Sequence, residues 1–170
     1  MVHHSYGGRK HIMLQETEIK FESHKDEVLN ELDKATEKVL YAIGLLGVEG
    51  CVEKASEIDT ATGRPTVDTG RYRAGFGFIT PTQGKMSGTQ TTSKEGKDDF
   101  SSQRSNKDTV IVANTVEYAP YLEFGSGTKK GGHHARYIMK NGIESKLSKM
   151  KEQTKKILKG EDISISFGGK

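Results

Sequence analysis

A single long helix is the strongest constraint that this sequence places on its fold. Ser23-His24-Lys25-Asp26 has the form of a capping box, in which a hydroxyl and a carboxylate bind the free backbone amides at the start of a helix. A helical pattern then continues to about Ile58. At a rise of 1.5 Å per residue, such a helix is roughly 50 Å long, which is unusual for a small domain.

Apolar side chains occupy two faces of this helix. The first stripe contains Val28, Leu32, Ala35, Val39, Ile43 and Leu46, with Gly47 and Gly50 near its extension. The second stripe, on the opposite side, contains Tyr41, Leu45, Val48 and Val52. A glycine costs up to about 1 kcal/mol relative to alanine in a helix, so we expect closely packed neighbours at Gly47 and Gly50. The second stripe predicts a subunit interface, and the alternative is a helix enclosed by layers of its own subunit.

The composition gives the helix few apolar partners within one chain. The 170 residues suit one domain, but only 32% are apolar, 29% are charged, 20 are glycine and none is tryptophan. We therefore expect other molecules to cover much of the surface. The net charge of +3, from 26 basic and 23 acidic residues, does not by itself favour nucleic-acid binding.

Two absences in the sequence bear on location and chemistry. No stretch approaches 18 consecutive apolar residues and the N-terminus has no apolar signal core, so we expect an intracellular, soluble chain without a membrane partner. The single Cys51 excludes an internal disulfide. Because Cys51 lies among apolar residues of the long helix, a small core side chain is favoured over a nucleophile.

Two segments predict a small antiparallel sheet. Aromatic residues alternate along 71–79, as in a half-buried strand, and T-V-I-V-A-N at 109–114 is typical of a short buried strand that pairs with it. The 27 residues between them, 81–107, are almost wholly polar and predict a flexible loop at the tip of a hairpin.

The segment after these strands predicts a turn and then a second helix. Pro120 disfavours an interior strand, whereas the spacing of Tyr118, Tyr121 and Gly125 predicts one or two helical turns that end at the glycine. A helix is expected from Ala135 to Lys159, stopped by Gly160. Its predicted buried stripe consists of Ile143, Leu147, Met150 and Ile157.

These elements predict an α+β fold. A long N-terminal helix and a C-terminal helix pack on a small, mainly antiparallel sheet with a long hairpin loop. Residues 1–22 form an N-terminal arm or short strand, 23–160 form a single domain, and 161–170 form a tail. In the tail, the alternating Ile163, Ile165 and Phe167 can add a strand to a sheet edge of this subunit or of a neighbour.

Charge is divided unevenly between the two helices. Residues 25–57 contain eight acidic residues and four lysines, whereas residues 140–159 contain seven lysines and two glutamates. Attraction between the two helices, within or between subunits, explains this division, although each surface pair contributes at most about 1 kcal/mol. Phosphate binding by the lysine-rich helix is the alternative.

No catalytic or metal-binding motif emerges, so we expect neither an enzyme nor a cofactor. The sequence contains no phosphate-binding G-x-x-x-x-G-K-[ST], no G-x-S-x-G, no H-E-x-x-H and no paired cysteines. His3-His4 and His133-His134 lack a carboxylate or cysteine at ligand spacing. Asp68, in D-T-G-R, fits a residue that closes a turn with its own backbone better than a general acid or base.

The remaining motifs resemble a known family. D-T-G-R-Y-R-A at 68–74, then Asn114, then Y-A-P-Y-L-E-F-G-S at 118–126, then Ala135-Arg136 resemble the tail-completion family of long-tailed bacteriophages and prophages. The resemblance covers roughly residues 24–150, in the same order, with a long helix before the motifs and a variable loop between them. The chain continues as Tyr137-Ile138 where that family usually has a proline-containing segment.

The resemblance implies a structural role in virion assembly. Members of this family join head and tail at the neck, so it implies a ring, expected to be a hexamer, between the portal and adaptor complex and the tail tube. The implied partners are copies of the chain, the adaptor, and the tail-tube or tail-terminator proteins, with DNA passing through the lumen without sequence-specific binding. The implied location is the neck of the virion, and the host cytoplasm during assembly.

The resemblance also marks the motif residues as a structural centre. These residues are Asp68, Thr69, Gly70, Arg71, Arg73, Asn114, Tyr118, Pro120, Tyr121, Glu123, Gly125 and Arg136. Within this set we hypothesise an ion pair between Glu123 and either Arg71 or Arg73. The alternative function is a basic nucleic-acid-binding module that uses the lysine-rich C-terminal helix.

Overall fold

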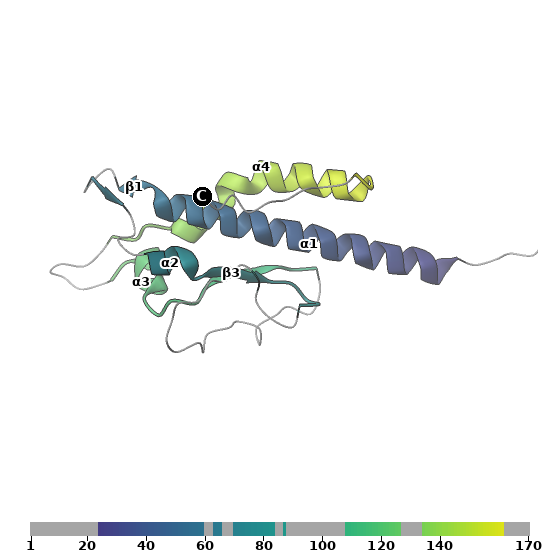
Figure 1. The fold of residues 1–170 in the computed structure, drawn as a ribbon, viewed down its shortest axis with the longest axis horizontal. Helices are drawn as coiled ribbons and strands as arrows, with labels where there is room; N and C mark the ends of the chain where they lie inside the picture. Colours follow the sequence, from purple (N-terminus) through teal and green to yellow (C-terminus); the bar gives the residue numbers. More distant parts are fainter. Residues whose placement is uncertain are drawn as a thin grey trace, which may run out of the picture.

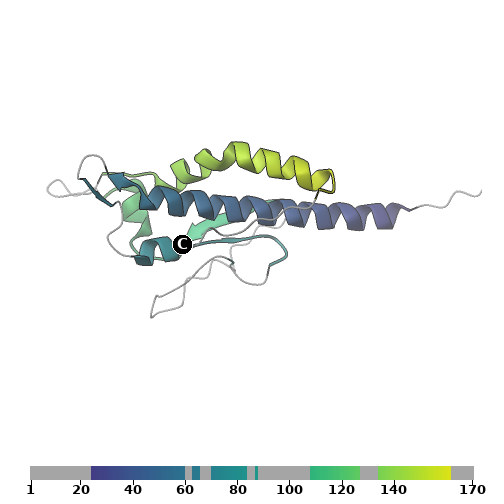
Figure 2. The ribbon, with the colours of Figure 1, turned by 45° about the horizontal axis from the view of Figure 1, so that its top comes forward.

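The computed structural model describes residues 24–59, 63–65, 70–83, 87, 108–126 and 134–161. They form three layers, with the long helix α1 in the middle (Figures 1 and 2). Helix α4 covers one side of α1, and two strands with two short helices cover the other. The principal elements are α1 (Lys25–Ser56), α2 (Gly70–Ala74), β3 (Phe76–Ile79), β4 (Ile111–Asn114), α3 (Ala119–Phe124) and α4 (Ile138–Leu158). The α+β prediction is confirmed.

The sheet layer is an antiparallel hairpin, as predicted. Strand β3 pairs with β4 from Phe76 opposite Asn114 to Ile79 opposite Ile111. Ser87 bridges the other edge of β3 through two backbone hydrogen bonds with Phe78, of 2.8 and 2.9 Å. A separate pair of two-residue strands, β1 (Ile58–Asp59) and β2 (Arg64–Pro65), follows α1.

Glycines bring the layers into backbone contact. A side chain at Gly50 would collide with the carbonyl of Gly142 in α4, and one at Gly142 would lie 2.7 Å from the backbone of Cys51. On the sheet side, a side chain at Gly44 would overlap the ring of Phe78. The expected close neighbour of Gly50 is therefore α4. The glycines lower the helix propensity of α1, but they allow tight packing on both of its sides.

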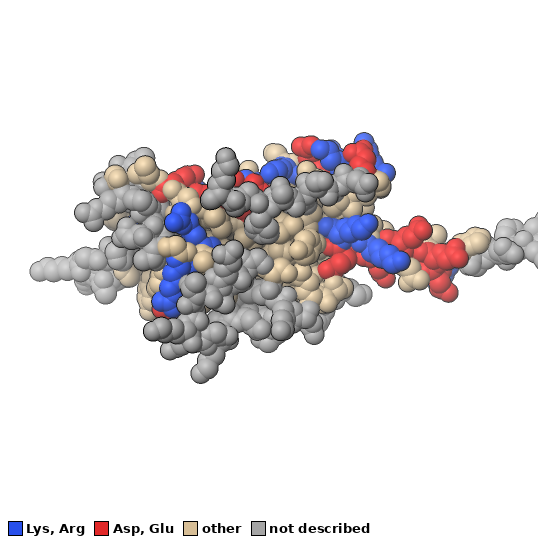
Figure 3. Space-filling model, in the orientation of Figure 1, with Lys and Arg blue, Asp and Glu red and all other residues tan. Residues whose placement is uncertain are grey.

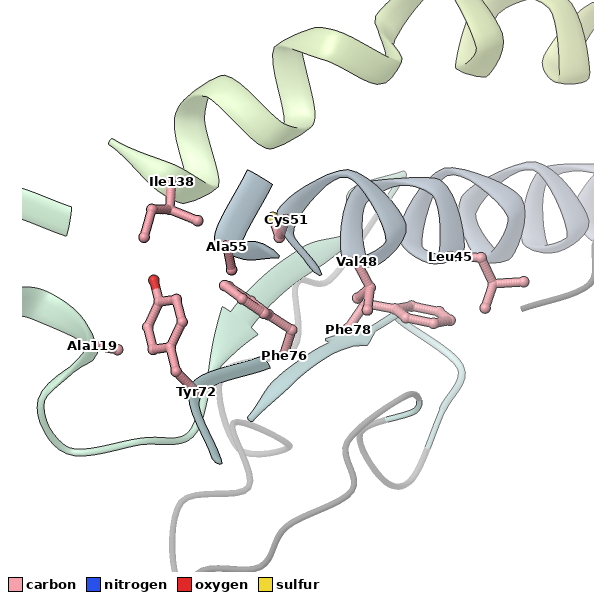
Figure 4. Packing of buried hydrophobic residues seen from close by; sticks show 9 residues of the cluster. All are labelled: Leu45, Val48, Cys51, Ala55, Tyr72, Phe76, Phe78, Ala119 and Ile138. Carbon is pink, nitrogen blue, oxygen red and sulfur yellow. The ribbon is translucent and has the colours of Figure 1, made fainter. Parts of the chain in front are cut away.

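The hydrophobic core lies between α1 and the sheet layer (Figure 4). Tyr72, Phe76 and Phe78 are its largest side chains, and each is 0% exposed. They pack against the face of α1 that carries Val48 and Cys51. Tyr41 adds an edge-to-face contact with Phe78, with ring centroids 5.1 Å apart.

The helix ends follow the sequence within a few residues. Helix α1 begins at Lys25, and the side chain of His24 before it makes no capping hydrogen bond. Ser23, the predicted cap, lies outside the described residues. Helix α3 confirms the predicted helical turns, with Pro120 near its start and Gly125, at a φ of 80°, just past its end. Helix α4 begins at Ile138 rather than Ala135 and stops before Gly160, which has a φ of 74°.

The prediction of one strand over residues 71–79 is wrong in its first half. Gly70–Ala74 is helical, and the N–H of Gly75 donates to the carbonyl of Arg71 at 3.0 Å. All four residues of β3 are buried, so the strand does not have one exposed face. The alternating pattern therefore predicted the strand correctly only for Phe76–Ile79, because its first part, up to Ala74, belongs to the helix α2.

The first apolar stripe of α1 is only partly buried, and the predicted buried stripe of α4 is wrong in part. In α1, Val28 is 60% and Leu32 is 55% exposed, whereas Leu46 is buried. In α4, Leu147 is 45% exposed while Met150 is buried. The first turns of α1 extend past the end of α4 (Figures 1 and 2), so no layer of this chain covers them among the described residues.

Several predicted features lie outside the described residues. They are the N-terminal arm 1–22, most of the 81–107 loop, and the tail residues Ile163, Ile165 and Phe167. Within the described ranges, no helix is both long enough and apolar enough to span a membrane.

Candidate functional site at the junction of α2, α3 and α4

The motif residues that are described meet at one end of the molecule. We call this region the junction; it comprises α2, Asn114, residues 118–125 and the first turn of α4. The structure therefore brings together segments that are far apart in the sequence. Asp68 and Thr69 lie outside the described residues.

Tyr72 is the buried centre of the junction. Its ring meets Phe76 edge to face at 4.9 Å and stacks on Tyr118 at 6.3 Å between centroids. Figure 4 shows it between Phe76 and Ala119, with its hydroxyl towards Ile138. That hydroxyl has no hydrogen-bond partner among the described residues, and burial above all raises its pKa well beyond the usual range.

Asn114 ties α2 to the end of β4. Its Nδ2 donates to the carbonyl of Tyr72 at 2.8 Å, and its Oδ1 accepts from the N–H of Val116 at 2.9 Å. The following residue continues the connection, because the N–H of Thr115 donates to the carbonyl of Gly75 at 2.9 Å. The amide thus satisfies buried backbone groups, which accounts for a polar side chain that is only 7% exposed.

Glu123 caps α4. Its Oε2 accepts from the N–H of Met139 at 2.9 Å and its Oε1 from the N–H of Lys140 at 3.2 Å, although the residue is only 7% exposed. These N–H groups have no partner within the helix, and the carboxylate also lies at the positive end of the helix dipole. Before α4, Tyr137 has a left-handed φ of 48°, and its N–H donates to the carbonyl of Glu123 at 3.2 Å.

The hypothesised pair between Glu123 and an arginine is therefore wrong. Arg71 pairs instead with Glu117, with Nη2 and Oε2 2.9 Å apart, and its guanidinium lies 5.9 Å from the centre of the Tyr118 ring. Arg73 donates to the hydroxyl of Ser56 at 3.4 Å. The sequence suggested pairing Glu123 with either of two arginines, but it carried no signal that backbone N–H groups would hydrogen-bond to the buried carboxylate.

The remaining motif residues lie at the surface of the junction or along its edge. Pro120 and Tyr121 are exposed on α3, with Tyr121 59% exposed, and its neighbour Phe124 is 73% exposed. Arg136 is half-buried, and its N–H donates to the carbonyl of Leu122 at 3.0 Å.

The predicted interface stripe of α1 is mostly internal. Leu45 and Val48 are 7% and 1% exposed and belong to the core, with Val52 half-buried against it. These residues face the chain's own sheet layer, so the alternative of a helix enclosed by its own subunit is correct for them. Tyr41, at 41% exposed, is the stripe residue that keeps a large exposed area.

Acidic α1 and basic α4 attract each other within the subunit. Lys146 Nζ lies 3.0 Å from Glu49 and 2.7 Å from Glu53, and Lys149 Nζ lies 3.2 Å from Glu49. Desolvation alone would raise the pKa of Glu49, but the hydrogen bonds and charges of Lys146 and Lys149 outweigh it and lower that pKa. Two of the seven lysines counted in the sequence are thus engaged with α1.

The described residues contain no group of three or more His, Cys, Asp and Glu side chains that could hold a metal ion. His134 is exposed, and the other paired histidines lie outside the described ranges. Burial, with a smaller contribution from the charge of Glu123, raises the pKa of the Cys51 thiol to about 12.

Comparisons with known proteins add no relative: no family model matches the sequence, and neither a curated protein nor a solved structure is significantly similar to it.

Proposed function

We propose that this chain is a structural head-to-tail connector of a tailed bacteriophage or prophage, which assembles as a ring at the neck of the virion. The observation that carries the proposal is the use of the motif residues at the junction. Tyr72, Asn114 and Glu123 are buried, and their polar contacts hold α2, β4 and α4 in place. Residues with such roles fit a subunit built for assembly rather than for chemistry.

The surface supports the same role. Large apolar side chains are exposed at both ends of the molecule, at Val28 and Leu32 on α1 and at Tyr121 and Phe124 on α3. Exposed apolar groups of this kind favour contacts with other protein subunits. A ring subunit presents two different surfaces to its two neighbours, which suits a chain with exposed apolar groups in more than one place.

The test is the location of the chain in purified particles. Phage particles produced by the strain that encodes the chain are labelled with an antibody against it and imaged by electron microscopy. Label at the neck, together with the chain in mass spectra of the particles, supports the proposal. Particles that lack the chain overturn it.

A nucleic-acid-binding module remains the alternative, and one observation favours it. Lys151 and Lys155 on α4 and Lys159 directly after it are exposed, and they form no ion pair with any residue of the described ranges. A duplex-binding module would lose affinity steeply with salt, by a factor that grows with the number of phosphate contacts. Fluorescence anisotropy with labelled duplex DNA at two salt concentrations separates the functions, because the connector proposal expects only weak, sequence-independent binding.

A further inference from the structure

The first turns of α1 present an apolar stripe that the other described elements do not cover. We call residues 25–34 the α1 tip; they extend beyond the other layers (Figures 1 and 2). Val28, Leu29 and Leu32 are 60%, 45% and 55% exposed there. Residues three and four positions apart on a helix are neighbours on one face. Leu32 follows Val28 by four positions and Leu29 by three, so the three side chains form a continuous stripe.

Acidic side chains flank this stripe. The tip contains Asp26, Glu27, Glu31 and Asp33 against Lys25 and Lys34. All six are exposed, and the only ion pair that these residues make within the described ranges joins Glu27 to His24 at 3.1 Å. Figure 3 shows acidic side chains over much of this end of the molecule. The tip is thus an apolar surface with an acidic border.

The outer face of α4 has the opposite charge and the same apolar character. Leu147 and Leu158 are 45% and 61% exposed, and Lys151 and Lys155 lie on the same face by their helical spacing. The face that packs on α1 is a different one, marked by Gly142, Lys146 and Met150. From Leu147 to Leu158, the outer face of α4 is therefore an apolar surface with a basic border.

We propose that the α1 tip of one copy docks on the outer face of α4 of a second copy. The inference rests on the proposed function, because it names the surfaces through which the ring would form. The two surfaces match in apolar character and in the sign of their charges. One molecule cannot join its own two surfaces, since the outer face of α4 points away from α1.

The charges also select this pairing over others. Two tips placed together would oppose acidic borders, and two α4 faces would oppose basic ones, so a symmetric contact is disfavoured in both cases. A head-to-tail contact between different surfaces propagates from copy to copy, and it closes into a ring when the rotation between copies allows it. The acidic border also makes the tip a poor surface for DNA.

Mixtures of proteins with one added cysteine each test the contact. Leu32→Cys and Leu158→Cys proteins, with tags of different mass, are mixed and oxidised, and the disulfide-linked products are separated by size. Cys51 is 0% exposed, so each variant has one accessible thiol. We expect the 32–158 heterodimer to exceed both homodimers severalfold. Thr82→Cys, an exposed site on the sheet side, serves as the control partner for Leu32→Cys.

Charge exchange then tests the borders. Glu31→Lys with Asp33→Lys in the Leu32→Cys protein should lower the heterodimer yield severalfold, and Lys151→Glu with Lys155→Glu in the Leu158→Cys protein should restore it. The proposal is overturned if the yield of the 32–158 heterodimer does not exceed that of the Thr82→Cys control, or if 32–32 homodimers dominate. It is also overturned if the heterodimer forms only after removal of residues 162–170, because the chain's own tail would then occupy the docking surface.

The outcomes separate this inference from the proposed function. Neck labelling without the 32–158 heterodimer leaves the connector function standing and overturns the contact. The heterodimer in a chain that purified particles lack supports the contact and overturns the connector function.

Discussion

Oε2 of Glu123 accepts a hydrogen bond from the backbone N–H of Met139 at 2.9 Å, so a carboxylate on α3 caps the first turn of α4. The same carboxylate accepts from the N–H of Lys140 at 3.2 Å. Helix α4 therefore begins where α3 holds it, and one buried side chain fixes the start of the outer layer.

Removing this cap should destabilise the fold. Glu123→Ala leaves two N–H groups without a protein acceptor, and we expect the free energy of unfolding to fall by about 2 kcal/mol. Glu123→Gln keeps an acceptor but loses the charge at the helix N-terminus, so about 1 kcal/mol is expected. Urea unfolding followed by circular dichroism measures both.

The matched control is the carboxylate that pairs with an arginine. Glu117→Ala removes the exposed partner of Arg71, whose loss should cost less than about 1 kcal/mol. Equal losses for Glu117→Ala and Glu123→Ala would contradict the capping role of Glu123.

Local sequence signals predicted much of the fold. The length of α1, the turn at Pro120 and the stops at Gly125 and Gly160 depend on residues close in the sequence, and they were correct within a few positions. The role of Glu123 depends on N–H groups 16 and 17 residues away, which no pattern marks.

Burial was harder to predict because it depends on which layers reach which turns. Val28 and Leu45 both belong to apolar stripes of α1, yet one is 60% and the other 7% exposed. The difference arises because α4 and the sheet cover only the later turns of α1. The opposite charges of α1 and α4 predicted attraction between the two helices, and the ion pairs confirm it within the subunit. Only the structure shows that Glu49 and Glu53 share Lys146.

Backbone contact between α1 and α4 should make Gly50 and Gly142 intolerant of a side chain. Gly50→Ala places a methyl group against the carbonyl of Gly142, and the helices must separate. We expect a loss of about 1–3 kcal/mol in unfolding free energy. Gly70→Ala is the control, because a side chain there meets nothing within 4 Å. A Gly50→Ala protein as stable as the control would show that the helices are not in backbone contact.

The buried hydroxyl of Tyr72 should contribute nothing to stability. Because it has no partner among the described residues, Tyr72→Phe removes a desolvated polar group and should be neutral or stabilising by up to about 1 kcal/mol. Tyr72→Ala removes the ring from the core and should cost about 3–5 kcal/mol. A loss of more than about 1 kcal/mol in Tyr72→Phe, measured by thermal unfolding, would reveal a hydrogen bond to that hydroxyl.

The α1–α4 ion pairs should give stability that depends on pH. The pKa of Glu49 is lowered in the folded state, so its contribution is present above the unfolded value of 4.5 and is lost as the pH falls through the folded pKa. The pKa of Lys146 is raised because Glu53 and Glu49 outweigh its desolvation, so its charge persists over the same range.

Lys146→Met should therefore be less stable than the original chain by about 1 kcal/mol at pH 7, and the difference should shrink at pH 3. Urea unfolding at the two pH values measures it. Lys151→Met, which removes a lysine without an ion pair in the described ranges, should change little at either pH. A difference for Lys146→Met that is constant with pH would mean that the lysine stabilises the fold through its alkyl chain.

Cys51 should report global unfolding. Its thiol is buried at 0% exposure, and burial raises its pKa to about 12, so the folded chain holds far less thiolate near neutral pH than an exposed thiol would. Because the thiolate is the reactive species, labelling by a disulfide reagent should be negligible in buffer. In urea, the labelling rate of Cys51 should rise with the fraction of unfolded chain. In the Gly50→Ala protein, this rise should occur at a lower urea concentration. Rapid labelling of the original chain in buffer would show that the α1–α4 contact opens without unfolding.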